Sequence, residues 1–314
     1  MFRIVRVACH SLIAMILFVA SAASLLAQEK TNWGFLEKHD CIVVSYQGKP
    51  IADFVFRDEA IRRPYLCHVK TLSGIQVTRN HPPIAGQDSV DHDTMHPGIW
   101  LAFGDISGVD FWRNKGTIQH VRWTQPPQAK NDRMLLESES QLLNAEGHSI
   151  GSVITRLTFM ADKSDWMVGW NATFQAKNEP LVFGDQEEMG FGARVATAIT
   201  EKSGGVILSS TGNRTAKDTW GQAADWCDYS GLINGKPAGI SLMSSPGNFR
   251  PSWWHNRDYG VFVANSFGRK AMGQGDLSSV IVEAGDQLNL AFAAVIHEGT
   301  AYSPEDWFKR LSMR

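Results

Sequence analysis

Apolar residues that recur with a period of two constrain the fold of this 314-residue chain more than any other feature. The clearest case is residues 165–174, where every second side chain is apolar: Trp166, Val168, Trp170, Ala172 and Phe174. Successive side chains of a strand point to opposite faces, so this pattern predicts a strand with one face buried in a core.

Comparable segments recur at short intervals and are separated by turn residues, as in antiparallel hairpins. They are residues 41–46, 51–56, 65–71, 75–79, 99–103, 118–123, 133–143, 149–160, 206–209, 237–243, 260–264, 279–282 and 287–296. Pro126 and Pro127 predict the end of the segment at 118–123, because proline cannot donate to a strand ladder.

One helix is expected, close to the C-terminus. Ser303 suits the N-cap, Pro304 suits the first helical position, and the helix is predicted to run to Arg310. Together these segments predict an all-β fold, a large antiparallel β-sandwich with one short C-terminal helix.

Residues 1–27 have the pattern of an export signal. Arg3 and Arg6 precede an apolar stretch at residues 12–20, and Ala27 is a suitable residue before a cleavage point. An uncleaved N-terminal membrane anchor is the alternative. No later apolar run reaches the roughly 20 residues that a spanning helix needs. We therefore expect a periplasmic or secreted protein, with residues 28–314 as one domain and no stable membrane insertion after cleavage.

Charge and cysteine content exclude several classes of protein. The formal net charge is −2, and removal of two arginines with residues 1–27 gives −4, so nucleic acid is not an expected partner. The cysteines after residue 27 are Cys41, Cys67 and Cys227, which allow one disulfide at most. Their spacing is not that of a zinc-binding motif.

Residues 91–112 form the most unusual stretch, with two histidines, four aspartates, three glycines and four aromatic residues. His92 and His96 lie four residues apart beside Asp91, directly before the apolar segment 99–103. A polar loop that leads into a buried strand is a common way to build a site. The alternative is a hydrogen-bonded turn with structural histidines.

Imidazoles beside carboxylates transfer protons or bind metals. We predict His96 as the main proton donor or metal ligand, with His92 and His255 assisting and Glu188 as a base. A divalent cation held by His92, His96 and His255 is an open alternative. The candidate substrate-binding residues are Asp91, Arg194, Trp226, Trp254, Arg257 and Asn265. Tryptophans near polar groups suit sugar rings, which have apolar faces and hydroxyl edges; a tryptophan-rich core is the alternative.

Three stretches of the chain share one resemblance: residues 91–112 with Asp91-His92 and His96-Pro97-Gly98-Ile99-Trp100, residues 183–194 with Glu187-Glu188-Met189-Gly190-Phe191-Gly192, and residues 220–265 with Trp254-His255-Asn256-Arg257-Asp258-Tyr259-Gly260. Together they resemble the PmoA-like family of bacterial proteins. The stretch from His96 to Trp112 is also similar to the substrate loop of galactose mutarotases, which implies a supersandwich fold. Methane oxidation by a membrane oxygenase requires several spans, which this chain lacks after residue 27.

Two hypotheses about function follow. The first is a secreted carbohydrate-active enzyme, an epimerase, lyase or hydrolase, that acts on a small sugar or glycan by acid–base chemistry. The second is a non-catalytic glycan-binding protein that uses the same aromatic surface.

Overall fold

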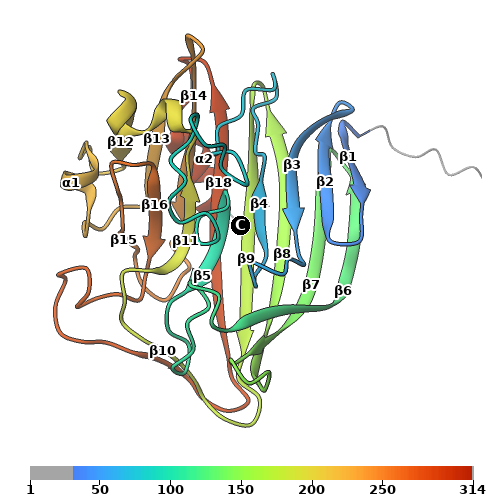
Figure 1. Cartoon of the computed structure of the whole chain (residues 1–314), viewed down its shortest axis with the longest axis vertical. Coiled ribbons are helices and arrows are strands. Elements are labelled where there is room, and N and C mark those ends of the chain that lie inside the picture. Colours follow the sequence, from blue (N-terminus) through green and yellow to red (C-terminus); the bar gives the residue numbers. More distant parts are fainter. Residues whose placement is uncertain (1–30, 313–314) are drawn as a thin grey trace, which may run out of the picture.

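The computed structural model describes residues 31–312, so the predicted export signal at residues 1–27 lies outside the described chain. Two eight-stranded antiparallel sheets face each other (Figure 1). The first sheet has the order β1 (Trp33–Glu37), β2 (Cys41–Tyr46), β3 (Lys49–Val55), β4 (Tyr65–Cys67), β5 (Ile99–Phe103), β11 (Met189–Arg194), β16 (Val261–Asn265) and β15 (Trp253–Trp254). The second sheet has the order β12 (Val206–Ser209), β13 (Trp226–Ile233), β14 (Lys236–Ser244), β18 (Gln287–Glu298), β9 (Asp165–Gln175), β8 (Ser149–Asp162), β7 (Arg133–Leu143) and β6 (Thr117–Lys130).

The remaining elements are small. Strands β10 (Leu181–Phe183) and β17 (Val280–Val282) form a separate pair, and the helical elements are α1 (Ala216–Thr219), α2 (Pro304–Ser312) and two 3₁₀ turns, Thr197–Ile199 and Glu201–Ser203. The prediction of a large antiparallel β-sandwich with a short C-terminal helix is thus confirmed. No helix within residues 31–312 is both long and apolar enough to cross a membrane.

The main hydrophobic core lies between the two sheets and confirms the period-two pattern. All five alternating apolar residues of β9 are buried in it, from Trp166 to Phe174. Phe54 and Phe191 of the first sheet contact Trp170 in this core, with ring centres 6.0 and 5.8 Å apart from it. The alternation in the sequence therefore reports the face of each strand that meets the opposite sheet.

Strand β6 corrects one prediction. It continues past Pro126 and Pro127 to Lys130, with irregular register against β7 between His120 and Gln128. β6 is the edge strand of the second sheet, so only one side of its backbone is paired. Prolines are tolerated on an edge strand and at bulges, and the sequence alone does not reveal which strand is the edge.

The predicted hairpin of residues 65–71 and 75–79 also differs from the structure. Its first strand ends at Cys67, and residues 75–79 form only isolated bridges, of which the one between Lys70 and Gln76 joins the two segments. His68 interrupts the strand because its backbone is left-handed, with φ of 51°. Strands β1, β10, β13 and β15 were not predicted.

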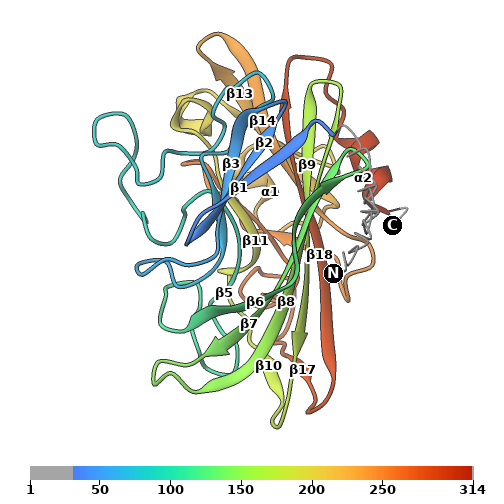
Figure 2. The same cartoon turned by 90° about the vertical axis from the view of Figure 1, so that its right-hand side faces the viewer.

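Each sheet also has an outer face with its own apolar cluster. Helix α2 covers the outer face of the second sheet, where Trp307 and Leu311 pack on Met167 and Met243. The outer face of the first sheet carries Trp100, Trp112 and their neighbours. Figure 2 shows α2 on one side of the sandwich and the long loops that follow β4 projecting on the other side.

Candidate functional site

The floor of the candidate site is the outer face of the first sheet. Trp100 of β5 lies opposite Gly192 of β11, which in turn lies opposite Val263 of β16. A Cβ atom at Gly192 would approach the Trp100 ring to 2.9 Å. Glycine at this position therefore lets the indole of Trp100 lie flat across the neighbouring strand.

His96 lies on this aromatic floor. Its ring stacks on Trp100, with centres 5.2 Å apart and planes 13° apart, and it meets the edge of Trp112 at 5.9 Å. The residue is only 6% exposed. Burial, together with the positive charge of Arg194, holds the pKa of His96 well below its usual value. His96 is thus a neutral imidazole, which is poorly suited to donate a proton.

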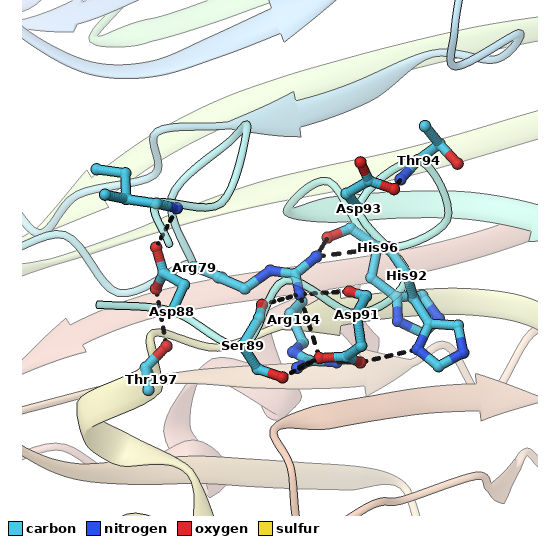
Figure 3. A network of polar contacts seen from close by, with 11 residues as sticks. Arg79, Asp88, Ser89, Asp91, His92, Asp93, Thr94, His96, Arg194 and Thr197 are labelled. Atoms are coloured by element: carbon cyan, nitrogen blue, oxygen red, sulfur yellow. Dashed lines mark hydrogen bonds and ion pairs between the residues drawn. The ribbon is translucent and has the colours of Figure 1, made fainter. Parts of the chain in front are cut away.

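His92 and Asp91 form a dyad beside His96 (Figure 3). The Nδ1–H of His92 donates to Oδ2 of Asp91 at 2.8 Å. Arg194 donates to both oxygens of the same carboxylate, at 3.1 and 3.0 Å. Burial alone would raise the pKa of Asp91, but the hydrogen bonds from Arg194, Ser89 and His92 outweigh it and lower the pKa. Asp91 is therefore ionised and fixes the tautomer of His92.

A second buried arginine shapes the loop that carries the dyad. Arg79 donates to the backbone carbonyls of Ser89, Asp91 and His96, at 2.8, 2.7 and 3.2 Å (Figure 3). The side chains of Arg79 and Arg194 are each only 2% exposed. This network ties the otherwise irregular loop at residues 89–96 to the sheet, so that the dyad is held in place.

His92 also touches the hairpin that ends in β16. Its ring lies parallel to Tyr259 at 6.4 Å, and the guanidinium carbon of Arg194 lies 4.6 Å from the centre of the same ring. The His92 side chain is 44% exposed, and its backbone is left-handed, with φ of 50°. Non-glycine residues rarely adopt this conformation, and such positions cluster at functional sites.

The same hairpin carries His255 and Arg257. The backbone N–H groups of His255 and Arg257 donate to the carbonyls of Val263 and Val261 in β16, at 3.0 and 2.7 Å. Nη2 of Arg257 donates to Oε2 of Glu187 at 2.6 Å. Nδ1 of His255 lies 3.1 Å from the same oxygen but is not aligned for a hydrogen bond. His255 and Arg257 together hold the pKa of Glu187 below its usual value.

Two predicted residues support this part of the site from its edge. The side-chain amide of Asn265 donates to the carbonyls of Gln186 and Glu187, at 2.8 and 3.0 Å, so Asn265 positions the backbone. Glu188 forms an ion pair with Arg113, with Oε1 2.9 Å from Nη2. The neighbouring acids Glu187 and Glu188 therefore have different partners: Glu187 lies beside His255, and Glu188 lies beside Arg113.

Two predicted sugar-binding tryptophans lie elsewhere. Trp254 is fully buried in the main core, and its indole N–H donates to the carbonyl of Ala224 at 2.9 Å. Trp226 lies under α2, where its indole N–H donates to Glu305 at 3.1 Å. Both rings are covered by protein and their polar atoms are satisfied, so neither is available to stack on a sugar.

The structure adds residues that the sequence interpretation did not select. Arg79 organises the dyad loop, and Tyr259 is the aromatic surface that contacts His92. The signal for Arg79 was a single arginine at the end of an apolar segment, directly before a polar loop. Tyr259 could not be separated from the neighbouring tryptophans by composition alone.

The proposed histidine metal site is not a compact ligand set. Across residues 31–312, only Asp53, Cys67 and His68 bring three possible ligand atoms within 4.8 Å of one another. His92 and His96 are close, with ring centres 5.2 Å apart. Asp91 contacts His92, but no His, Cys, Asp or Glu among the described residues completes such a group of three with the two histidines.

Comparisons with known proteins give a family and several distant structural similarities. A family model described as a family of unknown function, DUF6807, matches residues 41–309. No curated protein matches the chain. A galactose mutarotase-like protein from Lactobacillus casei is 10% identical, with a TM-score of 0.38 over 84% of this chain and 100% of its own.

The galactose mutarotase related enzyme from Lactobacillus acidophilus is also 10% identical, with a TM-score of 0.37 over 86% of this chain and 98% of its own. At such low similarity, neither relative's activity transfers to this chain. None of these matches supports the resemblance to the PmoA-like family that the sequence suggested.

Proposed function

The chain belongs to the DUF6807 family, whose function is unknown, and we propose that it binds a small sugar or glycan and acts on it by acid–base chemistry. The observation that carries this proposal is the His92–Asp91 dyad, held by buried Arg194 beside the ring of Tyr259. Export to the periplasm or the medium, expected from residues 1–27, is consistent with such a role.

His92 is the proposed acid–base residue. Because its Nδ1–H is engaged by Asp91, its Nε2 carries the lone pair and has no partner among the described residues. An imidazole oriented by a carboxylate takes a proton from a substrate and returns it, as in other general acid–base sites. This role moves from His96, as the sequence suggested, to His92, because His96 is buried and neutral.

The surroundings of His92 favour a sugar as the ligand. Tyr259 offers a partly exposed aromatic face, and sugar rings pack their apolar C–H faces on such surfaces. Arg257 and Glu187, each about one-third exposed, offer donors and acceptors for hydroxyl groups. Arg113 and Glu188 extend this polar edge. An epimerase, a lyase and a hydrolase are all compatible with one imidazole base and a polar edge.

The test is a screen of mono- and oligosaccharides, including uronic and other oxidised sugars, for both binding and turnover. His92→Ala should lower kcat by about 10²- to 10⁴-fold and leave sugar binding within a few-fold. His148→Ala is the matched control, because His148 lies exposed in the turn between β7 and β8. Unchanged kcat in His92→Ala would reject His92 as the acid–base residue.

The second candidate function is glycan binding without catalysis. It rests on the same partly exposed ring of Tyr259 and its charged neighbours. If sugars bind, Tyr259→Ala abolishes binding, and no sugar is turned over, this second function replaces the first.

A further inference from the structure

A second cluster of reactive side chains lies on strands β3 and β4, apart from the histidine dyad. Asp53 and Cys67 are direct cross-strand partners, so their side chains share one face of the sheet. His68 follows Cys67 and would point to the opposite face in a regular strand. Its left-handed backbone, with φ of 51°, breaks this alternation and brings both side chains to the same side.

The three side chains meet at close range. Nδ1 of His68 lies 2.8 Å from Oδ2 of Asp53 and 3.6 Å from Sγ of Cys67. In a tetrahedral zinc site, sulfur and nitrogen ligands lie about 3.5 Å apart, and nitrogen and oxygen ligands about 3.3 Å apart. The cluster therefore needs a shift of about half an ångström between Asp53 and His68 to hold such an ion.

The outer nitrogen of His68 has the environment of a metal ligand. Its Nε2–H donates to the backbone carbonyl of His81 at 2.7 Å. Nδ1, the atom that faces Asp53 and Cys67, donates its proton to Asp53 and would have to release that proton to a bound cation, while the Nε2–H stays on the carbonyl of His81. Metal-bound histidines commonly donate their other N–H to a backbone carbonyl or carboxylate in this way.

The cluster also opens on a cavity of about 640 Å³, lined among others by Cys41, Asp53, Tyr65, Cys67, His68 and His81. Cys67 itself is only 2% exposed, whereas the side chains of Asp53 and His68 are 26% and 42% exposed. Three protein ligands beside a cavity leave a coordination position for water or a small ligand, unlike a closed structural site.

We propose that Asp53, Cys67 and His68 bind a borderline divalent cation of the Zn²⁺ class through oxygen, sulfur and nitrogen, with the fourth position open to the cavity. Thiolate and imidazole ligands select such ions over Mg²⁺ or Ca²⁺, which require oxygen ligands. This site is independent of the proposed sugar chemistry, because the dyad of His92 and Asp91 shares no residue with it.

The test uses Co²⁺ as a spectroscopic probe and Zn²⁺ as its competitor, on the purified protein with its thiols reduced. The wild-type protein should bind one Co²⁺ per chain, with a thiolate-to-cobalt charge-transfer band that Zn²⁺ abolishes. Cys67→Ser should lose the band and weaken Zn²⁺ binding at least about 10-fold. Cys41→Ser is the matched control, since Cys41 lines the same cavity outside the ligand set, and it should behave as wild type.

A second measurement is needed because Cys67 is buried and the Cys67→Ser variant could lose Zn²⁺ binding through misfolding alone. Zn²⁺ should raise the Tm of the wild type and of Cys41→Ser, because a cation that binds only the folded state stabilises it. Asp53→Asn and His68→Gln change partly exposed ligands and should each reduce this rise. The proposal is overturned if the wild type gives no charge-transfer band, or if both of these variants keep wild-type Zn²⁺ affinity. In either case the cluster is only an ion pair between Asp53 and His68 beside a thiol.

Discussion

The outer faces of the two sheets are covered in opposite ways. On the second sheet, the amphipathic helix α2 lays Trp307 and Leu311 on methionines such as Met167 and Met243. On the first sheet, irregular loops lie over Trp100 and are held by two buried arginines, Arg79 and Arg194. One cover is apolar and helical, and the other is polar and depends on charged hydrogen bonds.

This difference separates stability from function within one sandwich. An apolar cover contributes mainly through burial and gives no group that can react with a ligand. A cover held by arginines needs carbonyls and carboxylates around it, and it keeps ionised and neutral groups side by side. The face with His92, Tyr259 and Glu187 is therefore the one that we propose for ligand binding and chemistry.

The largest expected effect is on the helical cover. Trp307→Ala removes a side chain that is 4% exposed, and the free energy of unfolding should fall by about 3–5 kcal/mol. Sugar binding should not change, because α2 lies on the opposite side of the sandwich (Figure 2). Urea denaturation and sugar titration measure the two quantities. Lys309→Ala, at an exposed position of the same helix, is the control. A loss of sugar affinity in Trp307→Ala would show that the two faces are coupled.

A smaller loss of stability is expected on the polar cover, but with a loss of function. Asp91→Asn removes the negative charge between Arg79 and Arg194 and should cost roughly 2–3 kcal/mol, less than a fully buried pair because Asp91 is 33% exposed. Turnover should fall as well, since His92 loses its orienting carboxylate. Asp93→Asn, on the same loop and exposed, should change stability by less than about 0.5 kcal/mol. Equal behaviour of the two variants in urea denaturation would contradict this account of the loop.

The pH dependence of stability gives the next effect. The pKa of His96 is depressed in the folded state, so the unfolded chain binds a proton below about pH 6.5 that the folded chain does not bind. Stability that is present above this pH is therefore lost as the pH falls, by up to about 1.4 kcal/mol per pH unit. The positive charges of Arg194, Arg63 and Arg79 act in the same direction.

His96→Gln isolates this contribution. Between pH 7.5 and 5.5, the slope of unfolding free energy against pH should be shallower in the variant than in the wild type. His120, whose burial lowers its pKa to about 4, contributes with the same sign in both proteins and cancels in the difference. Identical slopes would mean that His96 accepts a proton in the folded protein, and its role as a neutral residue would have to be abandoned.

The sequence predicted the parts of the fold that depend on local periodicity. The alternation from Trp166 to Phe174 identified the buried face of β9, and Pro304 marked the start of α2. It did not predict β6 past Pro126 and Pro127, because the edge position that tolerates them is set by the order of strands. Local sequence patterns thus predict individual strands and helices, whereas the order of strands in the sheet determines where an exception such as a proline within a strand is tolerated.

The candidate site shows the same limit at the level of single residues. The sequence selected His92, His96, Asp91 and Arg194, which the fold does bring together. It could not assign their roles, because these depend on which imidazole stacks on Trp100 and which one reaches Asp91. His68 was not selected at all, since its pairing with Asp53 follows from strand register and from a left-handed backbone.

The smallest expected effect concerns the acidic pair beside the site. Glu188 is 31% exposed and Arg113 is 40% exposed, and such an ion pair contributes less than about 1 kcal/mol. Glu188→Gln should therefore leave stability nearly unchanged, and turnover should change less than about 10-fold if His92 is the base. Glu187→Gln is the variant to compare with it. Because Glu187 contacts both His255 and Arg257, this substitution should lower turnover more than Glu188→Gln does. A Glu188→Gln variant that folds normally, binds sugar and has lost turnover would return the role of base to Glu188, as the sequence first suggested.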